Sequence, residues 1–446
     1  MKTKRLAGAI GASLALLLTS CGSDEKSASP ATAAAPKSTS ATAATPGATD
    51  VAEATTPTTA ASKNTTASED TTAPQDSSAT EDTIHSMSPA EMAAAAKAEG
   101  ELNIIVWAGY AEDGSTDPAV DWVTPFEDET GCAVNVKVGN SSDEMVTLMQ
   151  SGEYDGVSAS GDATTRLIDG GDVAPVDLTQ VPNYADVFDG LKMKPWNSKD
   201  GKAYGIPHGR GANLLVYNTE AFPTAPDSWS AMFETNSAAA GAISVYDSPI
   251  YIADAAIYLM STKPALKITN PYALDQTQFD AAIALLQQQK GIASQYWATT
   301  TDQATALEDG SVTAGTTWQY TVSLALGNGA KIAAIKAKEG ATGWSDTWMV
   351  SSKAKHPSCM YLWMNHIVSP KVNAQVAEWF GEAPSNAKAC ALASAGFCGS
   401  YHAQDDGYWD DVWYWTTATE TCLDGRTDAK CIPYSDWVTA WSKLRA

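Results

Sequence analysis

The chain has 446 residues, of which 44% are hydrophobic, and its formal net charge at pH 7 is −24. The hydrophobic content suffices for a sizeable core, and the length suggests two or three domain-sized units. So large a negative charge argues against nucleic acid as a partner, because phosphate binding needs clustered lysine and arginine side chains.

Residues 1–20 have the pattern of a secretory signal peptide, with a basic head and an apolar run too short to span a bilayer as a stable anchor. The run ends in Leu18-Thr19-Ser20-Cys21, which resembles the bacterial lipobox. This resemblance implies that Cys21 is acylated and that lipid alone holds the protein on the outer face of the membrane. A stray cysteine behind an ordinary signal peptide is the alternative.

Residues 21–86 consist largely of alanine, serine, threonine and proline. Such a stretch buries too little apolar surface to offset its ordering entropy, so we expect a disordered tether behind the lipid. A leading helix is predicted over residues 87–100, because Ser88 and Glu91 have the spacing of a capping box.

From residue 101 onward, strand and helix patterns alternate. The expected order is a strand at 102–107, a helix at 119–129, a strand at 134–138, a helix from residue 141, a strand at 155–158 and a helix at 164–169. Pro125 should bend the first of these helices or mark its true start. This order predicts an α/β fold with a mostly parallel sheet covered by helices.

Cysteine counting supports export. Six cysteines remain beyond Cys21, and an even number in an exported chain suggests disulfides. Six cysteines allow fifteen pairings, and the sequence does not choose among them. Short loops favour Cys390–Cys398 and Cys422–Cys431, which leaves Cys132 for Cys359. Because no C-x-x-C pair occurs and the histidines are scattered, neither a metal site nor a cofactor is predicted.

Several phrases, in this order along the chain, resemble the spermidine/putrescine-binding proteins of ABC importers. They are Asn103-Ile104-Ile105-Val106-Trp107, Phe126-Glu127-Asp128-Glu129-Thr130-Gly131, Gly152-Glu153-Tyr154-Asp155-Gly156-Val157, Tyr204-Gly205-Ile206-Pro207, Val216-Tyr217-Asn218-Thr219, Thr317-Trp318-Gln319, Trp344-Ser345-Asp346 and Gly381-Glu382-Ala383-Pro384-Ser385-Asn386. No single phrase is diagnostic, and their shared order carries the resemblance.

The resemblance implies a two-lobed fold of the periplasmic-binding-protein type II class, with two α/β lobes joined by a two-crossover hinge. The crossovers are expected near 208–212 and 317–320. Lobe 1 would then hold residues 101–209 and 319–367, and lobe 2 residues 210–318 and 368–446. The resemblance also implies a monomeric, non-enzymatic capture protein that closes on a polyamine such as spermidine or putrescine. It would deliver this cargo to the permease and ATPase subunits of an importer.

A protonated amine that leaves water needs carboxylates for its N–H groups and aromatic faces for its charge and methylenes. The family pattern places a stacking ring at Trp107, with Tyr110 nearby, and a hydroxyl at Ser160. Core filling is the alternative reading of both rings. Asp162 stands where the family has a tyrosine, and it is either an amine ligand or a plain helix N-cap.

The second half of the chain adds four candidates. Asp247 and Asp346 match acidic ligand residues of the family, although the second acid expected three positions after Asp247 is replaced by Ile250. Trp318 is a candidate for stacking on the ligand, and either Trp344 or Trp348 for a wall of the cleft. Weaker candidates are Trp297, Gln319 and Tyr320.

Arg210 is the strongest departure from the family pattern, because it stands where a hinge aromatic is usual. A guanidinium facing the cleft would pair with a ligand carboxylate and favour a zwitterionic, amino acid-like amine. The alternative is a salt bridge to an acidic residue at the hinge.

Three rival functions belong to other classes. A glycan-active enzyme would need two carboxylates at a separation that a sequence does not show, and the chain lacks G-x-S-x-G, H-E-x-x-H and P-loop motifs. A ferric-ion receptor would need a close pair of tyrosines, and no Tyr-Tyr pair occurs. A carbohydrate receptor stays open because the chain has 15 tryptophans.

Overall fold

The computed structural model describes residues 87–446. The expected signal peptide, the acylation of Cys21 and the tether over 21–86 therefore lie outside the described residues. Within residues 87–446, no helix combines the length and the apolar character needed to cross a membrane.

The N-terminal part of the described chain forms the predicted strand-and-helix alternation. The leading helix α2 (Pro89–Glu99) begins at an N-cap on Ser88, whose side chain and backbone make the predicted capping box with Glu91. Helix α3 (Val123–Thr130) starts at Val123, so Pro125 lies in its first turn, where a missing N–H costs nothing. The expectation that Pro125 marks the true start of this helix is confirmed.

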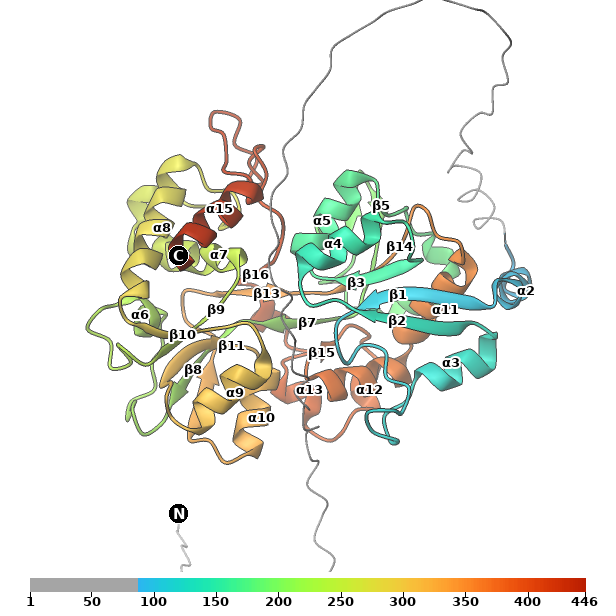
Figure 1. Ribbon diagram of the computed structural model, residues 1–446, viewed down its shortest axis with the longest axis horizontal. Helices are drawn as coiled ribbons and strands as arrows, with labels where there is room; N and C mark the ends of the chain where they lie inside the picture. The colour runs from blue at the N-terminus through green and yellow to red at the C-terminus, as the bar shows by residue number, and fades with distance from the viewer. Residues whose placement is uncertain (1–86) are drawn as a thin grey trace, which may run out of the picture. The chain divides into compact units, whose positions relative to one another are not determined.

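The first sheet has the strand order β2-β1-β3-β14-β6 (Figure 1). Strand β1 runs parallel to β2 and β3, whereas β14 is antiparallel to β3. Its strands are β1 (Glu101–Val106), β2 (Ala133–Val138), β3 (Gly156–Ala159), β6 (Ile206–Pro207) and β14 (Thr347–Val350). Its helices are α2, α3, α4 (Ser142–Gln150), α5 (Gly161–Gly170), α11 (Pro357–Ile367) and α12 (Pro370–Phe380). We call this unit lobe 1.

The second sheet has the strand order β10-β9-β11-β8-β12, with β9, β10 and β11 parallel to one another. Its strands are β8 (Leu214–Asn218), β9 (Ile243–Tyr246), β10 (Ala293–Trp297), β11 (Ala314–Thr317) and β12 (Ile332–Ile335). Its helices are α6 (Ser230–Phe233), α7 (Ile252–Thr262), α8 (Gln276–Lys290), α9 (Thr300–Glu308), α10 (Gln319–Gly327) and α15 (Tyr434–Arg445). We call this unit lobe 2.

A third, small sheet joins the two lobes in the order β15-β7-β13-β16 (Figure 1). Its strands are β7 (Gly209–Ala212), β13 (Ala341–Trp344), β15 (Ala383–Pro384) and β16 (Val412–Tyr414). Strand β7 carries the chain from β6 to β8, and the antiparallel β13 carries it back from β12 to β14. The remaining short elements are β4 (Ser198–Lys199), β5 (Lys202–Ala203), α13 (Phe397–Ser400) and α14 (Asp406–Trp409).

The return crossover differs from the expectation. It lies at β13, whereas we expected it near residues 317–320. Residues 319–335 stay in lobe 2 because β12 pairs with β8 and because Val322 and Ala325 of α10 pack with Val216. Residues 368–380 also differ, since Val372 and Val376 of α12 pack in the core of lobe 1.

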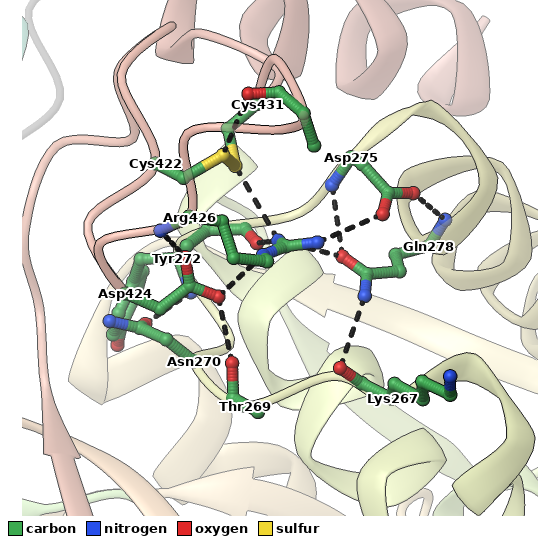
Figure 2. Close-up of polar contacts among 12 residues, drawn as sticks. Lys267, Thr269, Asn270, Tyr272, Asp275, Gln278, Cys422, Asp424, Arg426 and Cys431 are labelled. Atoms are coloured by element: carbon green, nitrogen blue, oxygen red, sulfur yellow. Dashed lines mark hydrogen bonds and ion pairs between the residues drawn. A yellow bond between two sulfur atoms is a disulfide. The ribbon is translucent and has the colours of Figure 1, made fainter.

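The six described cysteines form three disulfides: Cys390–Cys398 and Cys422–Cys431, which the short loops favour, and Cys132–Cys359, the pair that remains. The first ties the chain before β2 to α11 within lobe 1. The third closes a loop over lobe 2, and at its centre Arg426 binds Asp424, Asp275 and Gln278 (Figure 2).

We call this loop, residues 422–431, the clasp. Arg426 Nε lies 2.8 Å from Asp424 and Nη1 lies 3.0 Å from Asp275, which is also the N-cap of α8. The Arg426 side chain is 25% exposed, so its ion pairs are partly shielded from water. The clasp therefore fixes the chain that enters α15 to the start of α8.

Replacing Arg426 by leucine should lower the free energy of unfolding by about 2 kcal/mol, because two carboxylates lose their partner in a partly shielded place. Denaturant unfolding followed by circular dichroism measures this loss. Lys430→Leu is the matched control, since its pair with Glu420 is exposed and should contribute at most about 0.5 kcal/mol. Equal losses in the two variants would show that Arg426 does not anchor the clasp.

Candidate functional site

The carboxyl end of the first sheet brings three predicted residues together. Strands β1 and β3 end there, followed by Trp107 and Ser160. Because β14 is antiparallel to β3 and Thr347 pairs with Ala159, the chain enters β14 at this same edge. Asp346, the residue before β14, therefore lies beside Ser160. The carboxyl ends of strands are where α/β folds place their ligands.

The Asp346 carboxylate is the centre of this group. It accepts hydrogen bonds from the Tyr110 hydroxyl at 2.7 Å and from the Ser160 hydroxyl at 2.6 Å. Asp346 is 3% exposed, and burial raises its pKa from 3.8 to about 6, although both hydrogen bonds act in the opposite direction. Within residues 87–446, no Lys, Arg or His nitrogen lies within 4.0 Å of it to form an ion pair.

A second buried acid, Asp162, lies in the first turn of α5 and is 4% exposed. The N-cap of α5 is Ser160, so the alternative interpretation of Asp162 as the N-cap is wrong. Its carboxylate accepts a hydrogen bond from Ser142 at 3.0 Å. Burial raises the pKa of Asp162, while nearby Arg166 lowers it, and its charge in turn raises the pKa of Asp346.

Lobe 2 supplies aromatic rings to the same place. Tyr246 and Trp297 end the parallel strands β9 and β10, and Trp318 follows β11. The ring centres lie 4.9 Å apart for Tyr246–Trp297, 5.5 Å for Tyr246–Trp318 and 5.0 Å for Trp297–Trp318. Trp415 stacks on Tyr246 at 5.9 Å with an interplanar angle of 5°. We call these four residues the aromatic group.

The aromatic group of lobe 2 faces the acids of lobe 1. The pKa of Tyr246 is raised first by burial and then by the charges of Asp162, Asp346 and Asp247, while a hydrogen bond with Ser248 lowers it. Asp162 and Asp346 therefore lie within electrostatic reach of the Tyr246 hydroxyl. A protonated amine with an apolar chain requires carboxylates for its charge and aromatic faces for its methylenes, and Tyr246 is the ring of the aromatic group that lies near the two acids.

The segment after β16 connects the lobes directly. Residues 415–419, which we call the strap, belong to lobe 2 through Trp415 and Ala418, both buried in its core. Thr417 reaches α5 of lobe 1, where it shares a hydrogen bond of 2.6 Å with Thr165 and donates to the Asp162 carbonyl at 2.6 Å. The strap thus covers the N-terminal turn of α5, next to both acids.

Two predicted rings lie at the border of this site. Trp107 is half-buried against the lobe 1 cores, and its indole N–H is buried without a hydrogen-bond partner. Trp344 is 7% exposed and packs edge-on against Phe380 at 5.9 Å. Trp348, the alternative candidate for the wall, is fully buried in the lobe 1 core.

Asp247 does not present a free carboxylate. Its oxygens accept hydrogen bonds from Trp441 Nε1 at 3.0 Å and from Arg445 Nε and Nη2 at 3.0 and 3.2 Å. Both partners come from α15, 194 and 198 residues along the chain. Asp247 thus differs from Asp346 in having a cationic partner, Arg445, although its charge also raises the pKa of Tyr246.

Among residues 87–446, Arg210 makes no salt bridge at the hinge. It is 2% exposed, and its guanidinium lies 4.1 Å above the Trp409 ring and donates to the Ala403 carbonyl at 3.1 Å. Within the described chain, no carboxylate oxygen lies within 4.0 Å of it, so the salt-bridge alternative is wrong. The pocket that Arg210 lines with Trp409 has a volume of about 20 Å³, room for about one water molecule and too little for a ligand carboxylate.

Sequence reasoning missed a buried pair below Tyr110. His208 stacks on the Tyr110 ring at 3.9 Å, and its Nε2 lies 3.3 Å from Glu382 Oε1. Burial lowers the pKa of His208 to about 3, and its Nδ1 accepts a hydrogen bond from Trp348 at 2.8 Å. Burial and then the charge of Asp346 raise the pKa of Glu382 well above its ordinary value. The imidazole of His208 thus stacks on Tyr110, whose hydroxyl donates to Asp346, whereas His208 Nε2 and both Glu382 oxygens are buried without a hydrogen-bond partner among the described residues.

Glu382 stood within one of the phrases that carry the resemblance, as an acid among small and apolar residues just before β15. An acidic residue in such a context is often buried, and this signal could have identified Glu382 as a candidate site residue. Within residues 87–446, no group of three or more His, Cys, Asp or Glu side chains is arranged to hold a metal ion.

Comparison with known proteins agrees with this architecture. The model of a family described as bacterial extracellular solute-binding protein matches residues 121–397. The spermidine/putrescine-binding periplasmic protein 1 of Haemophilus influenzae is 23% identical over 305 residues, which cover 66% of this chain and 78% of that protein. The putrescine-binding periplasmic protein PotF of Escherichia coli is 24% identical over 316 residues, with coverages of 66% and 80%.

Among solved structures, a putative spermidine/putrescine ABC transporter from Listeria monocytogenes superposes with a TM-score of 0.62 at 18% identity. The match covers 78% of this chain and 99% of the Listeria chain. It establishes the two-lobed periplasmic-binding-protein fold for this chain, although the two sequences are only 18% identical.

Proposed function

This chain belongs to the bacterial extracellular solute-binding protein family, and on that premise we propose that it captures a diamine or polyamine between its lobes. Members of the family act outside the cytoplasm, bind a small molecule and work with the permease and ATPase subunits of an ABC importer. The cargo that we propose is of the putrescine or spermidine type, held at Asp346.

One observation carries this proposal: Asp346 is buried and hydrogen-bonded, yet it has no cationic partner within the described chain. A buried carboxylate without a counter-charge is costly, and a protonated amine supplies the missing charge. The aromatic group then offers faces that attract the cation and cover its methylenes. A zwitterion finds less support, because the Arg210 guanidinium lies against the Trp409 ring, donates to the Ala403 carbonyl and lines a pocket of only about 20 Å³.

Anchoring at the membrane is also part of the proposal. The phrase Leu18-Thr19-Ser20-Cys21 behind a signal-peptide pattern supports acylation of Cys21, with residues 21–86 as the tether. Mass spectrometry of the mature protein from a bacterial membrane fraction tests this: a lipid-modified Cys21 as first residue supports it, and an unmodified N-terminus excludes it.

Isothermal titration calorimetry with purified residues 87–446 tests the cargo. We expect saturable binding of putrescine or spermidine, and no saturable binding of γ-aminobutyrate or maltose at the same concentrations. Binding of maltose alone would favour a carbohydrate receptor. Binding of γ-aminobutyrate alone would favour a receptor for zwitterionic amines.

The affinity for putrescine should fall in acid. The amine pairs with the ionised form of Asp346, whose pKa is raised to about 6, so protons compete with the ligand below that pH. Between pH 7.5 and pH 5 the dissociation constant should rise about tenfold, while the amine itself stays protonated. Titrations over this range check the slope, which should vanish in Asp346→Asn; a flat profile for the wild-type protein would place the cation elsewhere.

A further inference from the structure

A chain of buried hydrogen bonds runs from the lobe 2 core to Trp318. The Trp318 indole N–H donates to the Asn213 side-chain oxygen at 2.9 Å. The amide nitrogen of Asn213 donates to the Thr342 hydroxyl at 2.6 Å, and this hydroxyl donates to Asp254 at 2.9 Å. Asn213, Thr342 and Asp254 are 6%, 0% and 3% exposed.

The direction of this chain is fixed at the Trp318 end. An indole N–H can only donate, so the Asn213 oxygen accepts and the Asn213 NH₂ group is left to donate to Thr342. The Asn213 side chain therefore turns its oxygen toward Trp318 and its NH₂ group toward Thr342. Burial raises the pKa of Asp254 to about 7, and the hydrogen bond from Thr342 opposes that shift.

The middle of the chain lies on both crossovers between the lobes. Asn213 lies between β7 and β8, and Thr342 belongs to β13. A main-chain hydrogen bond from Asn213 N to Thr342 O, 2.8 Å long, runs beside the side-chain bond. The rotation of the Trp318 ring is thus tied to the segments that connect the lobes.

From this geometry we propose that Asn213, Thr342 and Asp254 are positioning residues that hold the Trp318 ring against the ligand space and couple its placement to the crossovers. The effect of the ring position on ligand binding rests on the proposed function. The position of the ring itself can be tested without any ligand. With its Nε1 bound to Asn213, the Trp318 ring keeps its orientation relative to Tyr246. Without this hydrogen bond the ring would rotate.

The test is ¹⁹F NMR of the protein labelled with 5-fluorotryptophan, without any amine. The Trp318 resonance is identified by its absence in Trp318→Phe. In Asn213→Leu, which has a similar volume and neither bond, this resonance should shift or broaden. The control Asn365→Leu removes a side-chain oxygen that accepts from Asn183 N in lobe 1, and it should leave the Trp318 resonance in place.

Two further comparisons keep the test decisive if Asn213→Leu fails to fold. Thr342→Val keeps the shape and the main-chain bond but lacks the hydroxyl, so it should shift the same resonance. Asp254→Asn retains an acceptor oxygen and should preserve the resonance, whereas Asp254→Leu should move it. An unchanged Trp318 resonance in Thr342→Val and Asp254→Leu would overturn the proposal.

Putrescine titration then distinguishes the positioning role of Asn213 from the proposed cargo. If the proposed function holds, Asn213→Leu should weaken putrescine binding about tenfold, and it should add nothing in a Trp318→Phe background. If the wild-type protein binds no putrescine while the Trp318 resonance still moves, the positioning role stands and the proposed cargo falls. Equal losses with and without Trp318 would mean that Asn213 acts by another route.

Discussion

Replacing Asp346 by asparagine should weaken putrescine binding by roughly 100- to 4000-fold. Loss of one partner from a buried charge pair costs roughly 3–5 kcal/mol, and each 1.4 kcal/mol corresponds to a factor of ten in affinity. Asparagine keeps the volume of the side chain, and the Tyr110 and Ser160 hydroxyls can either donate to it or accept from it. The loss of putrescine affinity would therefore measure the contribution of the negative charge of Asp346.

The stability of Asp346→Asn should move in the opposite direction. Because the pKa of Asp346 in the folded protein is raised, its favourable contribution to folding is fully present below about pH 4 and is lost as the pH rises through about 6. Without ligand at pH 7.5, the asparagine variant should be at least as stable as the wild type. Calorimetric titration and thermal unfolding measure the two effects.

The exposed pair of Asp227 with Lys338 provides the control for Asp346→Asn. Asp227→Asn removes the same unit of charge from a side chain that is 77% exposed, so it should change neither putrescine affinity nor stability measurably. If Asp346→Asn lowered stability strongly and left affinity intact, Asp346 would be a structural residue.

Gly161→Ala should weaken putrescine binding by roughly 10- to 100-fold without unfolding the protein. A Cβ at Gly161 would lie 1.9 Å from the Trp415 carbonyl oxygen, which belongs to the strap. A main-chain oxygen has no flexible end to move aside, so the strap of lobe 2 must withdraw from α5 of lobe 1. Overpacking of this kind costs about 1–3 kcal/mol, which is lost from the lobe-closed state.

Small-angle scattering and calorimetry together check the Gly161 prediction. With saturating putrescine, Gly161→Ala should keep a larger radius of gyration than the wild-type protein. Gly327→Ala is the matched control, because a Cβ there meets no atom within 4 Å. Unchanged affinity in Gly161→Ala would mean that contact between the strap and α5 plays no part in binding.

Local patterns predicted the first lobe well. The capping box of Ser88, the position of Pro125 in its helix and the strand–helix alternation depend on residues close in sequence. The return crossover was misplaced because β12 is a short strand whose position is decided by pairing with β8, more than 110 residues earlier in the chain. Pairing over such a separation leaves no local signal.

The candidate site was predictable where strand order alone determines it. Ser160 and Asp346 meet because one follows β3 and the other precedes its antiparallel neighbour. Asp247 also follows a strand, but α15 returns from the far end of the chain and places Arg445 on its carboxylate. The Trp409 ring, which stacks on the Arg210 guanidinium, likewise comes from a distant part of the sequence. Neither partner could be inferred from residues near the acid or the arginine.

A crystal structure of residues 87–446 with putrescine would show directly whether Asp346 binds the cargo. We expect one ammonium nitrogen of putrescine within about 3 Å of an Asp346 oxygen, with its methylenes against the Tyr246 and Trp318 rings. Putrescine bound away from Asp346, or Asp346 still lacking a cationic partner in the saturated crystal, would contradict this expectation.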